Sequence, residues 1–236
     1  MSESCSTIQK ITASPSVINK KMYSQRREQL AYLLQSTHYD AVSGWIYLAA
    51  FFYQTKQYSN ALYILSYAMM KCTPEKVYRE TKKLSQLQIN FITSTTLQKL
   101  GILRVWKLVA VFMLEFTRYS AFLLPEELAL DFVDSIYFSP VAFAHFLCFL
   151  CNYHLNDIQQ CYTSIRDLQL TIDEKYFITD SLDTEESYYL LGVALQLVRR
   201  TDLAKRAFTK AIQCNPHHTT SGAVKRLSMM HPFEKE

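Results

Sequence analysis

The residues from Glu185 to Pro216 restrict the fold more than any other stretch, because they have the pattern of two short antiparallel helices. Each half carries apolar residues at i, i+4 spacing, which places them on one face of a helix. Gly192 and Ala204 are small and stand where the two helices would touch. Thr201-Asp202 separates the halves and can cap the second helix, which ends before Asn215-Pro216. The first helix is expected to begin at a cap formed by Asp183 or Thr184.

The composition extends this helical expectation to the whole chain. About half of the residues are apolar, so a disordered polymer is not expected. Only 4 glycines and 6 prolines are present, too few for a many-turned β-sandwich or barrel. Long segments repeat their apolar residues at helical spacing, which predicts an all-α fold of antiparallel helix pairs. The formal net charge of +4 is typical of ordinary surface solubility, so nucleic acid is not an expected partner.

The pair of segments resembles a tetratricopeptide repeat. The family's signature positions, read from Glu185 onward, are occupied here by Tyr188, Leu191, Gly192, Leu195, Ala204, Phe208, Ala211 and Pro216. A second match runs from Val42 to Thr73 and places Trp45, Leu48, Ala49, Phe52, Ala61, Leu65 and Ala68 at the same positions. The resemblance implies that these side chains pack the two helices of each repeat together. It also implies a short, irregular, tetratricopeptide-like α-solenoid.

The spacing between the two matches is not a whole number of repeats, so irregular elements are expected between them. Helices are predicted over Tyr23–Gln35, Glu75–Ile92, Leu97–Tyr119, Pro125–Asp134, Ser139–Tyr153 and Ile158–Leu170, the last two forming a degenerate pair. A short capping helix is predicted from Thr219 or Thr220 to Met229. The domain organisation is therefore a flexible tail over residues 1–21, a helical domain over 22–216, and a capping helix with a tail over 217–236.

Three phrases of the sequence together resemble a narrower family: Trp45–Leu65, Lys71–Lys76 and Phe146–Asn156. They are similar to the helical tail that follows the nucleotidyltransferase-like domain of invertebrate Mab-type, cyclic-dinucleotide-synthase-like proteins. The enzyme domain of that family carries a Gly-Ser phosphate-binding turn and paired acidic metal ligands. This chain has neither, so the resemblance implies no activity. It supports the alternative of a regulatory region of an innate-immune receptor that lacks its catalytic domain.

One set of residues has the composition of a zinc site: His145, Cys148, Cys151 and His154. On a single helix, the first and last of these side chains point in opposite directions, so they are expected to be buried thiols and hydrogen-bonded histidines instead. Asp131 and Asp134 are neighbours at a helix end and are expected to form a solvated edge. We therefore predict no catalytic residue, cofactor or metal, and we expect reduced thiols and a cytoplasmic location.

The resemblance also implies a binding groove, since the inner helices of such repeats line a concave surface that takes peptides. The matching positions are Ile46, Tyr47, Ala50, Tyr53, Tyr189, Val193 and Gln196. An apolar peptide, or the chain's own segment Leu97–Tyr119, could fill this groove, or the residues could simply be covered within the chain. The predicted function is a non-catalytic helical-repeat module for protein–protein interaction. No small-molecule substrate, secretory leader or membrane span is expected.

Overall fold

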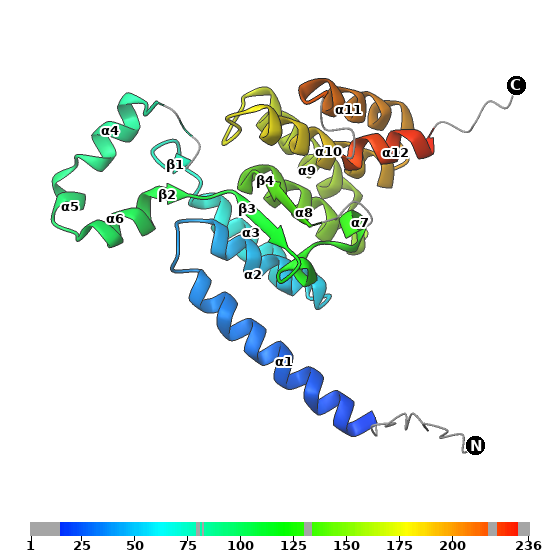
Figure 1. The fold of residues 1–236 in the computed structure, drawn as a ribbon, viewed down its shortest axis with the longest axis horizontal. Helices are drawn as coiled ribbons and strands as arrows, with labels where there is room; N and C mark the ends of the chain where they lie inside the picture. Colours follow the sequence, from blue (N-terminus) through cyan, green and yellow to red (C-terminus); the bar gives the residue numbers. More distant parts are fainter. Residues whose placement is uncertain (1–14, 79–80, 82, 130–133, 217–220, 231–236) are drawn as a thin grey trace, which may run out of the picture.

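The structure, a computed structural model, describes residues 15–78, 81, 83–129, 134–216 and 221–230, and for residues 15–22 and 129 only the backbone. Most of these residues lie in helices that pack on one another, which confirms the helical class (Figure 1). The prediction of an exclusively α-helical fold is corrected by short strands. Within the described residues these are β1 (Val77–Tyr78), β2 (Ala110–Val111), β3 (Leu114–Thr117) and β4 (Ser135–Phe138).

Antiparallel helix pairs form the body of the molecule. Helices α2 (Ser43–Gln54) and α3 (Tyr58–Met70) coincide with the first predicted pair. Helices α10 (Ser181–Leu197) and α11 (Thr201–Cys214) coincide with the last. Between them in space lie α8 (Pro140–His154) and α9 (Ile158–Asp173), since α3 packs on α8 and both α8 and α9 pack on α10.

The same turn closes all three pairs. Lys56, Asn156 and Arg199 follow the first helix of their pair with φ values of 61°, 58° and 60°. In each turn the next residue donates its N–H to a carbonyl five residues earlier, at Phe52 (2.8 Å), Asn152 (2.9 Å) and Leu195 (2.9 Å). This is the Schellman arrangement, in which a left-handed residue satisfies carbonyl groups at a helix end. The predicted degenerate pair α8–α9 therefore has the turn of the other two.

The residues predicted to pack each pair lie between its helices. Leu48, Ala61, Leu191, Ala204, Phe208 and Ala211 are buried, and Trp45 is half-buried against Tyr67. Gly192 is required by a close approach, because a Cβ atom there would lie 2.4 Å from Cε1 of Phe208. Such a distance is shorter than real side-chain contacts, so the two helices touch through the bare backbone of residue 192.

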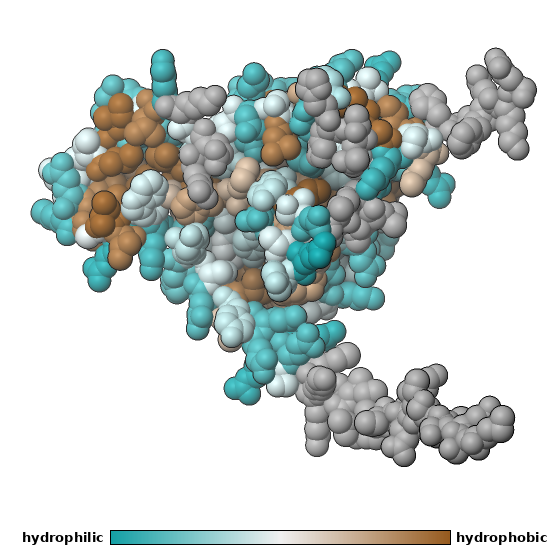
Figure 2. Space-filling model, in the orientation of Figure 1, coloured by the Kyte–Doolittle hydropathy of each residue, from teal (hydrophilic) through white to brown (hydrophobic). Residues whose placement is uncertain are grey.

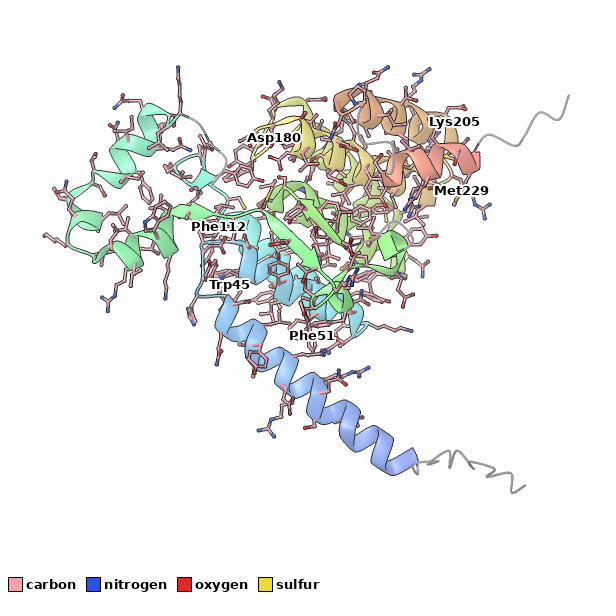
Figure 3. The ribbon with its side chains drawn as sticks, viewed as in Figure 1. Trp45, Phe51, Phe112, Asp180, Lys205 and Met229 are labelled. Carbon is pink, nitrogen blue, oxygen red and sulfur yellow. The ribbon has the colours of Figure 1, made fainter. Side chains whose placement is uncertain are left out.

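Helices at the two ends of the described chain pack on this body. Helix α1 (Pro15–Ser36) begins inside the segment expected to be a tail, and its C-terminal end meets α2 (Figure 1). Helix α12 (Gly222–Met230) packs on α10 and α11, as expected of a cap, and its predicted start at Thr219 or Thr220 lies outside the described residues. The cap of α10 was predicted wrongly: Asp180 accepts a hydrogen bond from the backbone N–H of Asp183 (Figure 3).

The predicted helix Leu97–Tyr119 is also wrong. Helix α5 (Thr95–Gln98) and helix α6 (Ile102–Val109) are short, and the chain then enters β2 and β3. Strand β2 pairs in parallel with β1, and β3 pairs antiparallel with β4 in the register Leu114↔Phe138. Helicity is lost beyond Val109 because two other segments supply backbone partners and the apolar residues Leu114 and Phe116 are buried by this pairing.

Two features of this insertion are used below. The β3–β4 pair, here called the ribbon, lies against α2 and α8 together with η1 (Ala121–Leu123) and α7 (Glu126–Ala129) (Figure 1). Helix α7 lies within the predicted helix Pro125–Asp134, of which residues 130–133 lie outside the described residues. Residues 83–109, here called the arm, contain α4 (Gln86–Ile92), α5 and α6 and project from the body beyond β1 and β2 (Figure 1).

Candidate functional site

The predicted groove residues are covered by other parts of the chain. Ile46, Ala50, Tyr53, Tyr189 and Val193 are buried, and Tyr47 and Gln196 are half-buried. In this structure a partner could not reach the buried members of the set. Of the alternatives considered from the sequence, coverage within the chain is the one observed, although the ribbon and α12 provide the cover rather than a long helix.

The ribbon and two residues beside it in the chain, Phe112 and Leu124, are held on the inner face of α2 by directed hydrogen bonds. The hydroxyl of Tyr47 accepts from the backbone N–H of Glu115 (2.6 Å) and donates to its carbonyl (3.0 Å). Burial raises the pKa of this hydroxyl above its ordinary value. The amide of Gln54 donates to the carbonyl of Leu124 (2.5 Å), and the hydroxyl of Ser43 donates to that of Phe112 (2.6 Å). These bonds satisfy polar groups that an open groove would offer to a peptide.

Helix α12 covers the corresponding face of α10. The guanidinium of Arg226 lies 5.7 Å from the ring centroid of Tyr189 and donates to Oε1 of Gln196 (3.2 Å) and to the carbonyl of Glu127. Arg226 therefore links α7, α10 and α12 across the inner face. The inner face is a packed interior in both halves of the molecule.

A polar cluster at the edge of this interior joins Tyr53, Glu127 and His154. The hydroxyl of Tyr53 lies 2.9 Å from Oε1 of Glu127 and 3.0 Å from Nε2 of His154, and the His154 ring stacks on Tyr58 at 4.8 Å. Burial and the Glu127 carboxylate raise the pKa of the Tyr53 hydroxyl, which keeps it protonated as a donor. The cluster therefore fixes α7 against α2 and α8.

The candidate zinc ligands all lie along the single helix α8 and serve different neighbours. His154 belongs to the cluster with Tyr53, and Cys151 is buried. Burial raises the pKa of Cys148 to about 12 and lowers that of His145, so both are held neutral. Among the described residues, no group of three or more His, Cys, Asp and Glu side chains has the arrangement of a metal site. Asp134 is paired with Arg118, and Asp131 lies outside the described residues.

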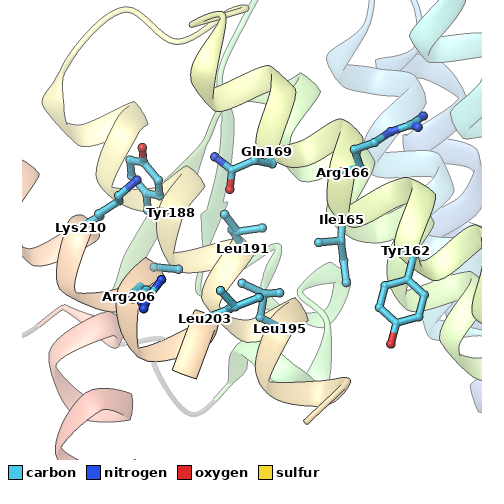
Figure 4. Close-up of a pocket in the computed structure, with 11 residues that line it drawn as sticks. Tyr162, Ile165, Arg166, Gln169, Tyr188, Leu191, Leu195, Leu203, Arg206 and Lys210 are labelled. Atoms are coloured by element: carbon cyan, nitrogen blue, oxygen red, sulfur yellow. The ribbon is translucent and has the colours of Figure 1, made fainter. Parts of the chain in front are cut away.

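A further concavity lies on the opposite face of the helix pairs. This outer cleft has a volume of about 540 Å³ and lies between α9 and α11, with α10 behind it (Figure 4). Its apolar floor is formed by Ile165, Leu191, Leu195, Leu203 and Ala207. Its polar and aromatic rim is formed by Tyr162, Arg166, Gln169, Tyr188, Arg206 and Lys210.

The charges at this cleft have one sign, because none of the described residues that line it is acidic. Lys210 lies 5.2 Å from the ring centroid of Tyr188, which orders its ammonium at the rim. Arg166 has a long, exposed contact with Asp167 (3.5 Å), which contributes little. Arg206 has no hydrogen-bond or ion-pair partner elsewhere in the described chain. The cleft therefore offers cations to a ligand together with apolar surface.

The sequence reasoning missed this cleft, although it named Leu191 as a packing residue. A signal was present on α11, where Arg206 and Lys210 stand four residues apart and share a face with Leu203. What the sequence does not show is that α9 and α11 stand far enough apart to leave a cleft. That separation depends on how neighbouring pairs pack, not on the pattern within one pair.

No family model, no curated protein and no solved structure matches this chain. None of the helices in the described residues combines the length and apolar character that crossing a bilayer requires.

Proposed function

We propose that this chain is a non-catalytic, helical-repeat interaction module, a short and irregular tetratricopeptide-like solenoid that binds an acidic protein segment in its outer cleft. The repeat assignment is supported by the common turn of the three helix pairs. It is also supported by small residues at one place in each second helix, namely Ala61, Cys161 and Ala204. Each of these residues allows its helix to approach the first helix of the pair.

The observation that carries the binding proposal is the combination of an apolar floor with a rim whose charged residues are all cationic. Leu195 and Leu203 offer apolar surface whose burial is worth roughly 25 cal/mol per Å². Arg166, Arg206 and Lys210 favour a ligand with carboxylates beside its apolar anchors, because opposite charge steers association and excludes basic partners. A short amphipathic helix with Leu, Ile or Phe anchors and Asp or Glu on its flanks fits both requirements.

The test is a selection of displayed random peptides on the full chain, followed by fluorescence anisotropy with the enriched peptide. We expect enrichment of acidic residues beside leucine, isoleucine or phenylalanine. Reversing the rim charges in Arg206→Glu/Lys210→Glu should weaken binding about tenfold or more. Raised salt should weaken it as well, because the rim is exposed to solvent.

A matched control reverses two cations outside the cleft, in Arg26→Glu/Arg27→Glu on α1. Both double variants change the net charge by the same amount. A difference in binding between them therefore reports where the charges lie and not the total charge. Equal loss of binding in the two variants, or enrichment of basic peptides, would contradict the proposal.

A further inference from the structure

The arm exposes more large apolar side chains than a stable solvent-facing element needs. On α6, Ile102 is 73% exposed, Leu103 is 74% exposed and Trp106 is 53% exposed. Leu84, Leu87, Ile89 and Leu108 are exposed as well. Figure 2 shows this apolar surface gathered over α4 to α6, away from the helix pairs. A contiguous apolar patch on a projecting element is typical of a surface that a membrane or another molecule covers.

The arm is also entirely basic in its charged residues. From Thr81 to Leu114 the sequence has no aspartate or glutamate, whereas the arm carries Lys83, Lys99, Arg104 and Lys107. The whole chain has 25 basic and 21 acidic residues, so this separation of charge is local. A surface of one sign favours an anionic counterpart and disfavours association with a second copy of the same basic arm.

Apolar and basic residues are arranged on α6 as on a helix that lies in a bilayer interface. Ile102 and Trp106 stand four residues apart on one face, while Arg104 and Lys107 stand three apart on the other. Tryptophan favours the level of the lipid headgroups, and lysine and arginine reach past the apolar face to phosphates. Leu87 and Ile89 of α4 are exposed as well, which enlarges the apolar surface of the arm beyond the short helix α6.

The base of the arm is attached to the helix pairs, so that binding of the arm to a surface would hold the helix pairs there too. Val77 pairs with Ala110, Tyr78 pairs with Val111, and the hydroxyl of Tyr78 donates to Asp183 of α10 (3.0 Å). The Lys76 ammonium, just before β1, donates to the carbonyl of Leu108 at the other end of the arm (2.6 Å). These contacts tie both ends of the arm to the helix pairs.

We propose that the arm docks the protein reversibly onto an anionic membrane surface, with Leu103 and Trp106 entering the interface and the neighbouring cations contacting lipid phosphates and carboxylates. This is surface binding without insertion across the bilayer. It uses residues distinct from the outer cleft, so it stands independently of the peptide-binding proposal.

The test is co-sedimentation of the full chain with vesicles of phosphatidylcholine alone, or of two parts phosphatidylcholine to one part phosphatidylserine. We expect binding only to the second composition, and weaker binding at higher salt. Leu103→Glu/Trp106→Glu should abolish binding. Lys99→Gln/Lys107→Gln should weaken vesicle binding about twenty-five-fold, because each lost cation weakens it about fivefold. In Trp45→Phe, where Trp106 is the remaining tryptophan, the fluorescence should shift to the blue with these vesicles.

The control Tyr63→Glu/Met70→Glu replaces two apolar residues on α3 that are more exposed than Leu103 and Trp106, and it should leave vesicle binding unchanged. Circular dichroism verifies that each variant is folded. Absence of binding to the anionic vesicles, equal binding to both compositions, or equal loss in the control would overturn the proposal. So would a dimer in light scattering that Leu103→Glu/Trp106→Glu dissociates without any vesicle binding, because a second copy would then cover the arm.

Discussion

At residue 192 the packing of a helix pair depends on the size of two opposing side chains. Gly192 faces Phe208, and the corresponding places relative to the turn hold Ala49 and Leu65 in α2–α3. In α8–α9 they hold Phe149 and Ile165, where the thiol of Cys161 approaches the carbonyl of Phe149 (3.9 Å). In α10–α11 the smaller residue is matched with the larger partner, and in α2–α3 a slightly larger residue is matched with a smaller one, so these two pairs divide a similar space differently, whereas α8–α9 carries two large residues.

The close contact between Gly192 and Phe208 predicts the effect of adding a methyl group at position 192 of α10. Gly192→Ala should lower the free energy of unfolding by about 2 kcal/mol, because the buried Phe208 ring has no room to move away. Adding Phe208→Leu, which recreates the Ala49–Leu65 combination, should make the cost of the alanine smaller than in the parent chain. Urea unfolding followed by circular dichroism measures both, as a double-mutant cycle.

The control for that cycle is Gly101→Ala, since a Cβ atom at Gly101 would meet nothing within 4 Å. Its unfolding free energy should stay within about 0.5 kcal/mol of the parent value. If Gly192→Ala lowers the unfolding free energy equally with phenylalanine and with leucine at position 208, the contact with Phe208 is not the cause of the loss.

The buried carboxyl of Asp183 makes a second prediction at the residue scale. It accepts hydrogen bonds from the Tyr78 hydroxyl (3.0 Å) and from the Thr179 N–H (3.0 Å), while burial raises its pKa above the ordinary 3.8. A raised pKa means that the folded state binds the proton more tightly than the unfolded state. The contribution of this group to stability is therefore greatest below pH 3.8 and declines as the pH rises through its folded-state pKa.

Removing the donor in Tyr78→Phe should reveal this titration. At neutral pH the variant should lose about 2 kcal/mol of unfolding free energy, because a hydrogen bond to an ionised carboxylate is lost. In acid, where the carboxyl is protonated, the difference between variant and parent should shrink. Urea unfolding across this pH range measures the difference directly, and a difference independent of pH would exclude Asp183 as the partner that matters.

At the scale of the element, the shared turn predicts which substitutions should stabilise the protein. Lys56 and Arg199 adopt the left-handed conformation, which strains any residue with a Cβ atom. Lys56→Gly and Arg199→Gly should each raise the unfolding free energy by about 0.5–1 kcal/mol, and Asn156→Gly by less, since asparagine tolerates this conformation. In contrast, Lys205→Gly within α11 should lower it by about 1 kcal/mol. Thermal melts of the four variants measure this order.

The elements that sequence reasoning predicted well are those whose signals are local. The starts of α8 and α9 followed from Ser139-Pro140 and Asn156-Asp157, which act within one turn of chain. The ribbon could not be predicted in this way. Leu114 and Phe116 belong to an apolar run that suits a helix equally, and their strand conformation depends on Ser135–Phe138 as a distant partner.

The same contrast between local signals and long-range contacts applies to the candidate site. Ile46 and Tyr189 lie on α2 and α10, the first helices of their pairs, but sequence alone left open whether that face binds a partner or is covered. The ribbon and Arg226 cover it through contacts between residues far apart in the chain. The outer cleft was missed for the related reason that it arises between helix pairs.

At the scale of the whole molecule, the insertion between the first two helix pairs divides into a part that belongs to the core and a part that does not. The ribbon contributes Phe116 and Phe138 to the same cluster as Phe143 of α8, with ring centroids 5.1 and 5.2 Å from the Phe143 ring. The arm instead joins the body at β1 and β2 and presents Leu103, Trp106 and other large apolar residues to solvent. The ribbon is therefore expected to be indispensable for folding and the arm dispensable.

Replacing the arm tests this division. Residues 84–108 can be exchanged for eight Gly-Ser residues, whose average span of roughly 16 Å is enough to reconnect two neighbouring short strands. The shortened chain should keep a cooperative melt and the helical circular dichroism of the body, because the buried clusters around Phe143 and Phe208 are untouched. It should also bind the peptide selected on the outer cleft as tightly as the parent, while losing the anionic vesicles. Loss of cooperative unfolding would show that the arm is part of the core, and retained vesicle binding would place the membrane contact elsewhere.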